Sequence, residues 1–346
     1  MENLIFSLNA TAPVFLMMLL GMLFRRLGWI DEAFASRMNR FVFLVPLPVL
    51  VFHDLASAEI GDVWNFRFVA FCFLVTAASI AICALLSCLL KEKTQRGEFI
   101  QASYRSSAAL LGIALTTNIY GDAGLVPLMI IGSVPLYNVM AVVVLSLTAP
   151  DEKGASGQPS DSASANPGSP SAVTAGNAVS GRNAASRKAE LWKRTLKGIV
   201  TNPIILGILA GLLWSILRLP LPPILEKTVT SLGDLAAPLG LMAMGATFRL
   251  DKAVGQAKPA IAASFIKLVG FCILFLPLAV RLGFREEELV AILIMLGSAT
   301  TVSCYVMAKS MGHEGVLTSS AVMLTTLFSA FTITAWLFLL KSLGLV

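Results

Sequence analysis

Long apolar stretches alternate with short polar stretches along most of the chain. Several of the apolar stretches carry no charged residue and are long enough to cross a hydrocarbon core of roughly 30 Å as a helix. These are Asn3–Phe24, Phe68–Leu90, Ala123–Pro150, Gly198–Leu217, Leu289–Ala308 and Gly315–Leu340. Four further stretches are shorter, or contain a lysine, prolines, glycines or other polar residues: Phe34–Ala56, Phe99–Tyr120, Leu232–Phe248 and Pro259–Val280. Together they predict ten membrane-spanning helices.

The two halves of the chain carry matching landmarks. Leu111–Ala114 and Leu296–Ala299 both read Leu-Gly-x-Ala, and each lies in a long apolar segment beside Thr, Ser or Asn residues. Glycine loosens a helix, so we expect helices four and nine to break near Gly112 and Gly297. Duplicated halves with helices interrupted at matching places are typical of secondary transporters.

We expect the chain to consist of three parts. Residues 1–149 form a first five-helix unit and 191–346 a second. Residues 150–190 form a disordered cytoplasmic linker, because a sequence rich in Ser, Ala, Gly and Asn cannot bury a core. A five-helix unit that is repeated after an odd number of crossings inserts upside down. The predicted fold is therefore an all-α integral membrane protein built from two inverted five-helix repeats.

Composition and charge agree with this class. Hydrophobic residues make up 56% of the 346 residues and charged residues 13%, which excludes a soluble domain because its surface could not be covered with polar groups. Lys and Arg are concentrated in the loops on one side of the ten spans, which places that side in the cytoplasm and both termini outside. The net charge of +6 reflects this topology and indicates no nucleic-acid partner.

Helices four and nine are the predicted site. An opened helix frees backbone N–H and C=O groups, which hydrocarbon does not tolerate unless they face a cavity, an ion or a partner segment. Hydroxyl and amide side chains cluster around both expected breaks: Ser106, Ser107, Thr116, Thr117 and Asn118, and Ser298, Thr300, Thr301, Ser303 and Tyr305. One such hydroxyl can also bond back to its own helix or allow close packing, but the paired clusters favour a site.

Two basic residues lie inside predicted spans. Lys267 is about 12 Å along the helix from Pro259, so its stem reaches only part of the way to the membrane surface. We expect it to face a polar interior with a carboxylate, a carbonyl or an anionic substrate as partner, and the alternative is a cytoplasmic-side anchor. Arg105 lies about two turns before Gly112 and either neutralises an anion or marks the start of its helix.

Other residues have two readings each. His53, Asp54 and Asp234 lie at ends of predicted spans, where they either relay a coupling proton or cation or are solvated and capping groups. Gly207–Gly211 either joins two copies of the chain or packs helices within one copy. Metalloprotease, serine-hydrolase and P-loop motifs are absent, and the five cysteines lack metal-ligand spacing. We therefore expect no enzyme, no cofactor and no metal site.

Three segments resemble the auxin efflux carrier family, whose bacterial members include malate and malonate permeases. They are Phe43–Phe52, Asn202–Pro203 with the glycines that follow, and Ala237–Ala246. The resemblance extends over all ten spans. It implies a scaffold of spans one, two, six and seven, a moving domain of the other six, and a substrate site where the broken spans four and nine cross.

The chain departs from this family at the crossover. The family has a proline in each broken span and an asparagine seven residues before the first, whereas this sequence has Ala114, Ala299 and Ser107 at those places. The loss of both prolines leaves Gly112 and Gly297 as the expected helix breakers.

We therefore predict a homodimeric, elevator-type secondary transporter of a small organic anion, a dicarboxylate such as malate or malonate, in a bacterial-type cytoplasmic membrane. The anion would lie between half-helix N-termini, where freed N–H groups and the helix dipole favour negative charge. The predicted substrate-binding residues are Arg105, Ser107, Gly112, Ala114, Thr117, Asn118, Lys267, Gly297, Ala299, Thr300 and Ser303. Two alternatives stay open: a sodium-coupled symporter of the bile-acid type, and a membrane ligand sensor that does not transport.

Overall fold

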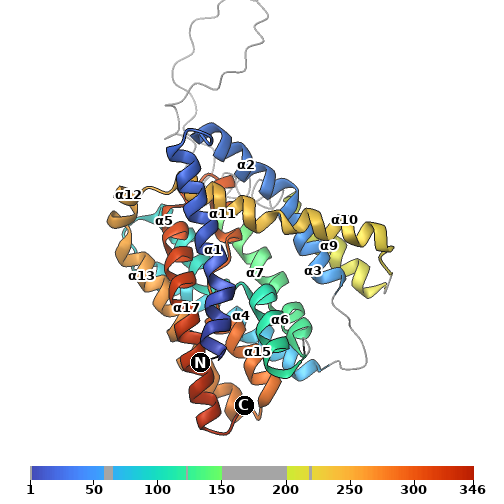
Figure 1. The fold of residues 1–346 in the computed structure, drawn as a ribbon. Coiled ribbons are helices and arrows are strands. Elements are labelled where there is room, and N and C mark those ends of the chain that lie inside the picture. The colour runs from blue at the N-terminus through green and yellow to red at the C-terminus, as the bar shows by residue number, and fades with distance from the viewer. Residues whose placement is uncertain (1, 58–64, 122–123, 150–200, 218–219) are drawn as a thin grey trace, which may run out of the picture.

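The computed structural model describes residues 2–57, 65–121, 124–149, 201–217 and 220–346, with the backbone alone for 2–11, 109–111, 113, 114 and 118. The predicted linker, 150–190, and the first residues of the second predicted unit lie outside these ranges. Within them every regular element is helical (Figure 1). The start of α1 and the end of α17 lie at the same end of the molecule (Figure 1).

The first half of the chain contains α1 (Glu2–Arg26), α2 (Glu32–Leu44), α3 (Pro46–Ala56), α4 (Phe66–Ser87), α5 (Lys93–Tyr104), α6 (Ala108–Tyr120) and α7 (Val126–Thr148). The second half contains α9 (Pro203–Ile216), α10 (Pro223–Asp234), α11 (Ala236–Thr247), α12 (Leu250–Gly255), α13 (Ala257–Phe265), the π-helix η2 (Ile266–Gly270), α14 (Phe271–Arg281), α15 (Glu286–Gly297), α16 (Ser303–Ser310) and α17 (Val316–Ser342).

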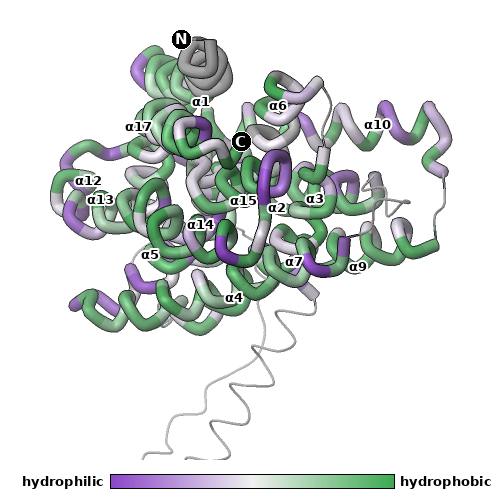
Figure 2. Tube along the Cα trace, turned by 90° about the horizontal axis from the view of Figure 1, so that it is seen from below, coloured by the Kyte–Doolittle hydropathy of each residue, from purple (hydrophilic) through white to green (hydrophobic). Residues whose placement is uncertain are grey.

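Six helical segments of the described chain are long and apolar enough to cross a membrane: Glu32–Ala56, Phe66–Ser87, Val126–Thr148, Pro223–Thr247, Ala257–Arg281 and Val316–Ser342. The other predicted spans coincide with α1, with the shorter apolar α9, and with the pairs α5–α6 and α15–α16. Large apolar side chains are exposed around the molecule, for example Leu209 and Phe338, and hydrophobic residues dominate the long helices in Figure 2. Such a surface requires lipid, so the chain is a multi-pass helical membrane protein.

Two spans are divided near a proline. Val45 ends α2, and Pro46 occupies the first position of α3, where its missing N–H costs nothing because the first N–H groups of a helix have no intrahelical acceptor. In the second half Leu235 separates α10 from α11, and Pro238 follows in the first turn of α11. After the first division α3 lies beside α9 (Figure 1).

Glycines let two helix pairs touch backbone to backbone. A Cβ atom added to Gly207 of α9 would lie 2.5 Å from the Pro48 carbonyl oxygen of α3, and one added to Gly211 would lie 2.8 Å from that of Phe52. In the same way Gly21 of α1 meets the Met242 carbonyl group of α11. The Gly207–Gly211 motif is therefore used for packing within the chain, the second of the two roles expected from sequence.

Both predicted helix interruptions exist, but one is displaced. Gly297 is the last residue of α15, so the second break begins where the sequence predicts it. The first break lies at residues 105–107. The prediction of a break near Gly112 is wrong, because α6 runs through Gly112, which is buried against Val126 of α7. Glycine is tolerated inside a helix where a neighbouring helix needs close approach.

The α3–α9 contact gives a first test. Gly207→Ala should destabilise the solubilised protein by about 1–3 kcal/mol, because its methyl group forces the α3 backbone away. Thermal unfolding measures this, and Gly255→Ala is the matched control because nothing lies within 4 Å of a Cβ atom there. If Gly207→Ala kept its melting temperature but lost self-association, the motif would instead join two copies of the chain.

Candidate functional site

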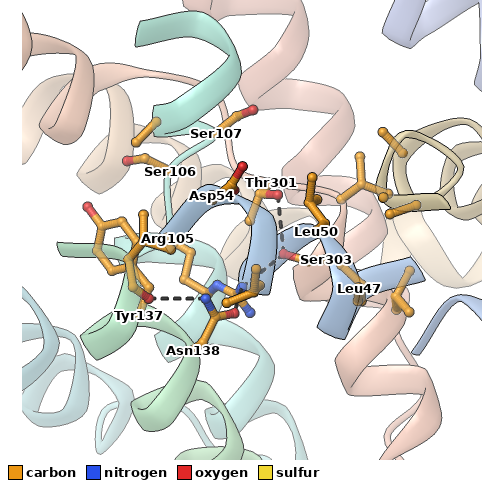
Figure 3. A pocket seen from close by; sticks show the side chains of 18 of the residues that line it. Leu47, Leu50, Asp54, Arg105, Ser106, Ser107, Tyr137, Asn138, Thr301 and Ser303 are labelled. Carbon is orange, nitrogen blue, oxygen red and sulfur yellow. Dashed lines mark hydrogen bonds between the residues drawn. The ribbon is translucent and has the colours of Figure 1, made fainter. Parts of the chain in front are cut away.

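A cavity of about 370 Å³ lies where the two broken helix pairs face α3 and the α10–α11 junction. One wall is formed by residues 105–108 of the first break, residues 299–303 of the second break, and α7. The opposite wall is formed by α3 and by the residues around the end of α10. Figure 3 shows Arg105, Asn138 and Ser303 from one wall and Asp54 from the other.

The two helix breaks contact each other directly. The backbone N–H of Ser107 donates to the carbonyl oxygen of Ala299 at 2.9 Å. The Thr300 hydroxyl donates to the Ala102 carbonyl at 2.8 Å, in the last turn of α5, where carbonyl groups have no intrahelical partner. The Gln101 amide nitrogen likewise donates to the Cys304 carbonyl at 2.9 Å. Each break thus satisfies backbone groups that the other one frees.

Two helices begin at the cavity. Ser107 precedes α6 and Val302 precedes α16, and neither residue makes a side-chain capping hydrogen bond. The first N–H groups of a helix lack intrahelical acceptors, and the helix dipole places a partial positive charge there. At α16 the N–H groups of Cys304 and Tyr305 donate to the Thr301 and Val302 carbonyls, so what this helix offers the cavity is chiefly the positive end of its dipole.

Arg105 adds a full positive charge to this wall. Its side chain is buried, and one terminal nitrogen donates to Asn138 Oδ1 at 2.7 Å and to Ser303 Oγ at 2.9 Å, while Nε has no hydrogen-bond partner (Figure 3). The salt bridges found among the described residues all lie elsewhere, on exposed side chains. A buried guanidinium without a carboxylate partner is costly, so this wall of the cavity favours negative charge.

The opposite wall carries two carboxyl groups. Asp54 of α3 and Asp234 at the end of α10 both line the cavity. His53 and Thr230, also in the lining, are 3.1 Å apart between Nε2 and Oγ1. The sequence suggested His53, Asp54 and Asp234 as candidates for coupling, and all three line this one cavity together with Arg105.

Lys267 lies outside the lining of this cavity. It is fully buried in η2, and its ammonium donates to the carbonyl oxygens of Leu296 at 2.8 Å, Met295 at 3.2 Å and Tyr104 at 3.4 Å, and to the Ser106 hydroxyl. Of the partners expected from sequence, carbonyl groups are the ones found. The ammonium holds helix ends together and does not reach the space where a substrate would lie.

The other predicted site residues divide into three groups. Ser107, Ala299, Thr300 and Ser303 join Arg105 in the cavity lining. Gly112, Thr117 and Gly297 do not line it; Thr117 is exposed, and a Cβ atom added to Gly297 would meet Cys272 Sγ at 2.9 Å. The surroundings of the Ala114 and Asn118 side chains lie outside what the structure describes.

Two lining residues were missed from the sequence. Asn138 accepts from Arg105 and donates to the Val134 carbonyl at 3.0 Å, and the Tyr137 hydroxyl donates to the Met295 carbonyl at 3.3 Å. A signal existed, since Asn138 is an amide in the middle of a span without charges, where polar groups are expensive and usually functional.

Comparison with known proteins agrees with this architecture. Residues 6–337, nearly the whole chain, match the profile of a family described as "Membrane transport protein". The chain belongs to the membrane transport protein family. This confirms the family relationship drawn from the Pro-Leu and Asn-Pro segments, and it confirms that transport is the function class.

One relative of this transport family is a "Putative malonate transporter" of Rhizobium meliloti (strain 1021). It is 30% identical to this chain over 152 residues. The match covers 42% of this chain and 45% of the relative, so the chain spans less than half the length of that protein.

The link between the two breaks can be tested through Thr300. Thr300→Val keeps the shape of the side chain but leaves the Ala102 carbonyl unpaired, which should lower the free energy of unfolding by about 1–3 kcal/mol. Thr334→Val is the control, because the Thr334 hydroxyl bonds only to Ala330 of its own helix. Equal thermal stability of the two variants would show that the Thr300 contact contributes nothing specific.

Proposed function

We propose that this transporter carries a small organic anion, a dicarboxylate such as malonate or malate, across the bacterial cytoplasmic membrane by alternating access. The observation that carries the proposal is the buried Arg105 without a carboxylate partner, beside the uncapped N-termini of α6 and α16. A dianion would satisfy both: one carboxylate on the guanidinium, the other at the positive end of the helix dipoles.

The size of the cavity supports a small substrate. About 370 Å³ is near the lower end for ligand pockets and has room for a short dicarboxylate with water. The hydroxyls of Ser107, Thr301 and Ser303 supply additional polar contacts at the rim. The name of the Rhizobium meliloti relative supports malonate as the first compound to test.

The arrangement of apolar clusters supports an elevator mechanism. One buried cluster joins α4, α5, α6, α7, α14, α15 and α17. A second one centres on α1, α2, α3, α9 and α11, with contributions from α7, α16 and α17. The cavity lies between the two, so movement of the first body against the second would expose the site alternately to the two sides of the membrane.

Two helix contacts support two inverted five-helix repeats. Helix α1 of the first half packs on α11 of the second half, and α9 of the second half packs on α3 of the first half. Each half thus contributes the same pair of helices to the contact. In this proposal ten spans place both termini outside the cell, and two copies associate as a homodimer. The association does not use Gly207 and Gly211, which are occupied within the chain.

In this proposal the coupling of transport to a proton or cation takes place at the wall that holds Asp54 and Asp234. A dianion beside Asp54 and Asp234 would be repelled unless those carboxylates hold a proton or a cation when the substrate is bound. We therefore assign the coupling step to this pair and substrate binding to Arg105.

Substrate binding is tested by thermal unfolding of purified protein with malonate, malate, acetate or glycerol. At a concentration of about 100 times Kd, the bound dicarboxylate should stabilise the protein by about 2.7 kcal/mol. Arg105→Gln should weaken this affinity at least tenfold, about 1.4 kcal/mol, while Arg281→Gln, which changes an exposed arginine, should not. A full malonate response in Arg105→Gln would contradict the proposed role of the guanidinium.

Asn138→Asp tests the role of the Arg105 charge by giving it a carboxylate partner within the chain. The new carboxylate would occupy the place of an oxygen 2.7 Å from the guanidinium and neutralise it from within the chain. The variant should melt at a higher temperature and lose its response to malonate. Asn138→Leu, which removes the hydrogen bond but leaves the charge unmet, should melt lower and still respond. Malonate binding by Asn138→Asp would show that the anion uses other groups.

A further inference from the structure

The crossover contains a second charge centre, at Lys267, which does not line the cavity. Two half-helices end there: α5 at Tyr104 and α15 at Gly297. The last carbonyl groups of a helix lack intrahelical donors and together carry a partial charge of about −0.5. Two such ends sum to about one negative charge, and one ammonium, that of Lys267, lies between them.

The surroundings of this ammonium consist of oxygen atoms. Three are carbonyl oxygens, from Tyr104, Met295 and Leu296, and the fourth is the Ser106 hydroxyl, which itself donates to the Met295 carbonyl. No salt bridge to Lys267 occurs in the described ranges. Among the described residues, the hydrogen-bond partners of this charge are therefore backbone carbonyl dipoles and one hydroxyl group.

The helix that carries Lys267 is adapted to this position. Residues 266–270 form a π-helical turn between α13 and α14, a local widening that is uncommon and often functional. Lys267 is fully buried. Its side chain projects from this turn to both helix ends at once.

In transporters with broken helices, unwound carbonyl groups and half-helix C-termini are the places that coordinate a coupling cation. We propose that Lys267 is a built-in cation that occupies this place permanently, so that the crossover holds together without bound sodium. Within the proposed transport function, this separates the two charge centres: the negative helix ends are neutralised by the chain itself, and the positive ends remain for the substrate. Sodium coupling at the crossover, one of the alternatives left open by the sequence, is thereby replaced by a fixed ammonium.

The experiment measures melting temperatures without any carboxylate ligand, in sodium chloride, methylammonium chloride and N-methylglucamine chloride at equal ionic strength. Wild-type protein should melt at the same temperature in all three. Lys267→Ala should melt about 5 °C or more lower in N-methylglucamine and recover part of the loss in methylammonium or sodium, because a small cation can enter the space left by the side chain. Lys258→Ala, a change of an exposed lysine in α13, should behave as wild type.

Lys267→Met keeps the bulk of the side chain and leaves no room for a cation. It should be destabilised and show no recovery. Should Lys267→Ala fail to fold, wild-type protein and Lys267→Met still decide the matter. A wild-type melting temperature that rises in sodium, or variants as stable as wild type in every salt, would overturn the proposal. If malonate failed to raise the melting temperature of the wild-type protein while the effects of the three salts were as expected, the proposed substrate would be overturned and the role of Lys267 would stand.

Discussion

A helix that opens inside a membrane must find partners for the backbone groups it releases, because hydrocarbon offers none. The breaks at residues 105–107 and 298–302 meet this requirement by facing each other. Ser107 donates to Ala299, Thr300 caps the end of α5, and Lys267 and Ser106 occupy the carbonyl groups at the end of α15. These contacts between the two breaks require the surrounding helices to hold α5, α6, α15 and α16 close together.

The same requirement sorts the charges. Carbonyl ends and amide ends of half-helices have opposite partial charges, and the structure places them on different sides of the crossover. Lys267 is enclosed with the carbonyl ends, whereas the amide ends of α6 and α16 open to the cavity beside Arg105. The positive charge that the chain neutralises internally and the positive charge that it leaves unmet therefore have different roles. In the proposed function, the unmet charge is the one that binds the substrate anion.

The surrounding helices fix where this centre lies. Glycines in α1 and α9 allow backbone contact with α11 and α3, which draws the inner halves of two divided spans against the broken pairs. Asp54 reaches the cavity from α3 and Asp234 from the end of α10. Buried residues of α5, α6 and α15 belong to the first apolar cluster, whereas those of α3 and α16 belong to the second. In the proposed elevator movement, a displacement of the first cluster against α3 would change the distance between Arg105 and Asp54. The interaction between these two charged groups would then depend on the conformation.

The sequence alone determined the membrane class, the helical fold, the position of most spans, the family and the break after Gly297. These follow from apolar length, charge distribution and short motifs, which are local properties of the chain. Tertiary structure decided the rest. Gly112 lies inside a continuous helix because α7 needs its small size, and the first break forms at Arg105–Ser107 because Ala299, Met295 and Lys267 accept or supply hydrogen bonds there. The sequence left more than one role open for both Lys267 and Arg105. One meets carbonyl groups and the other an open cavity, since the partner of a buried charge comes from segments distant in the chain.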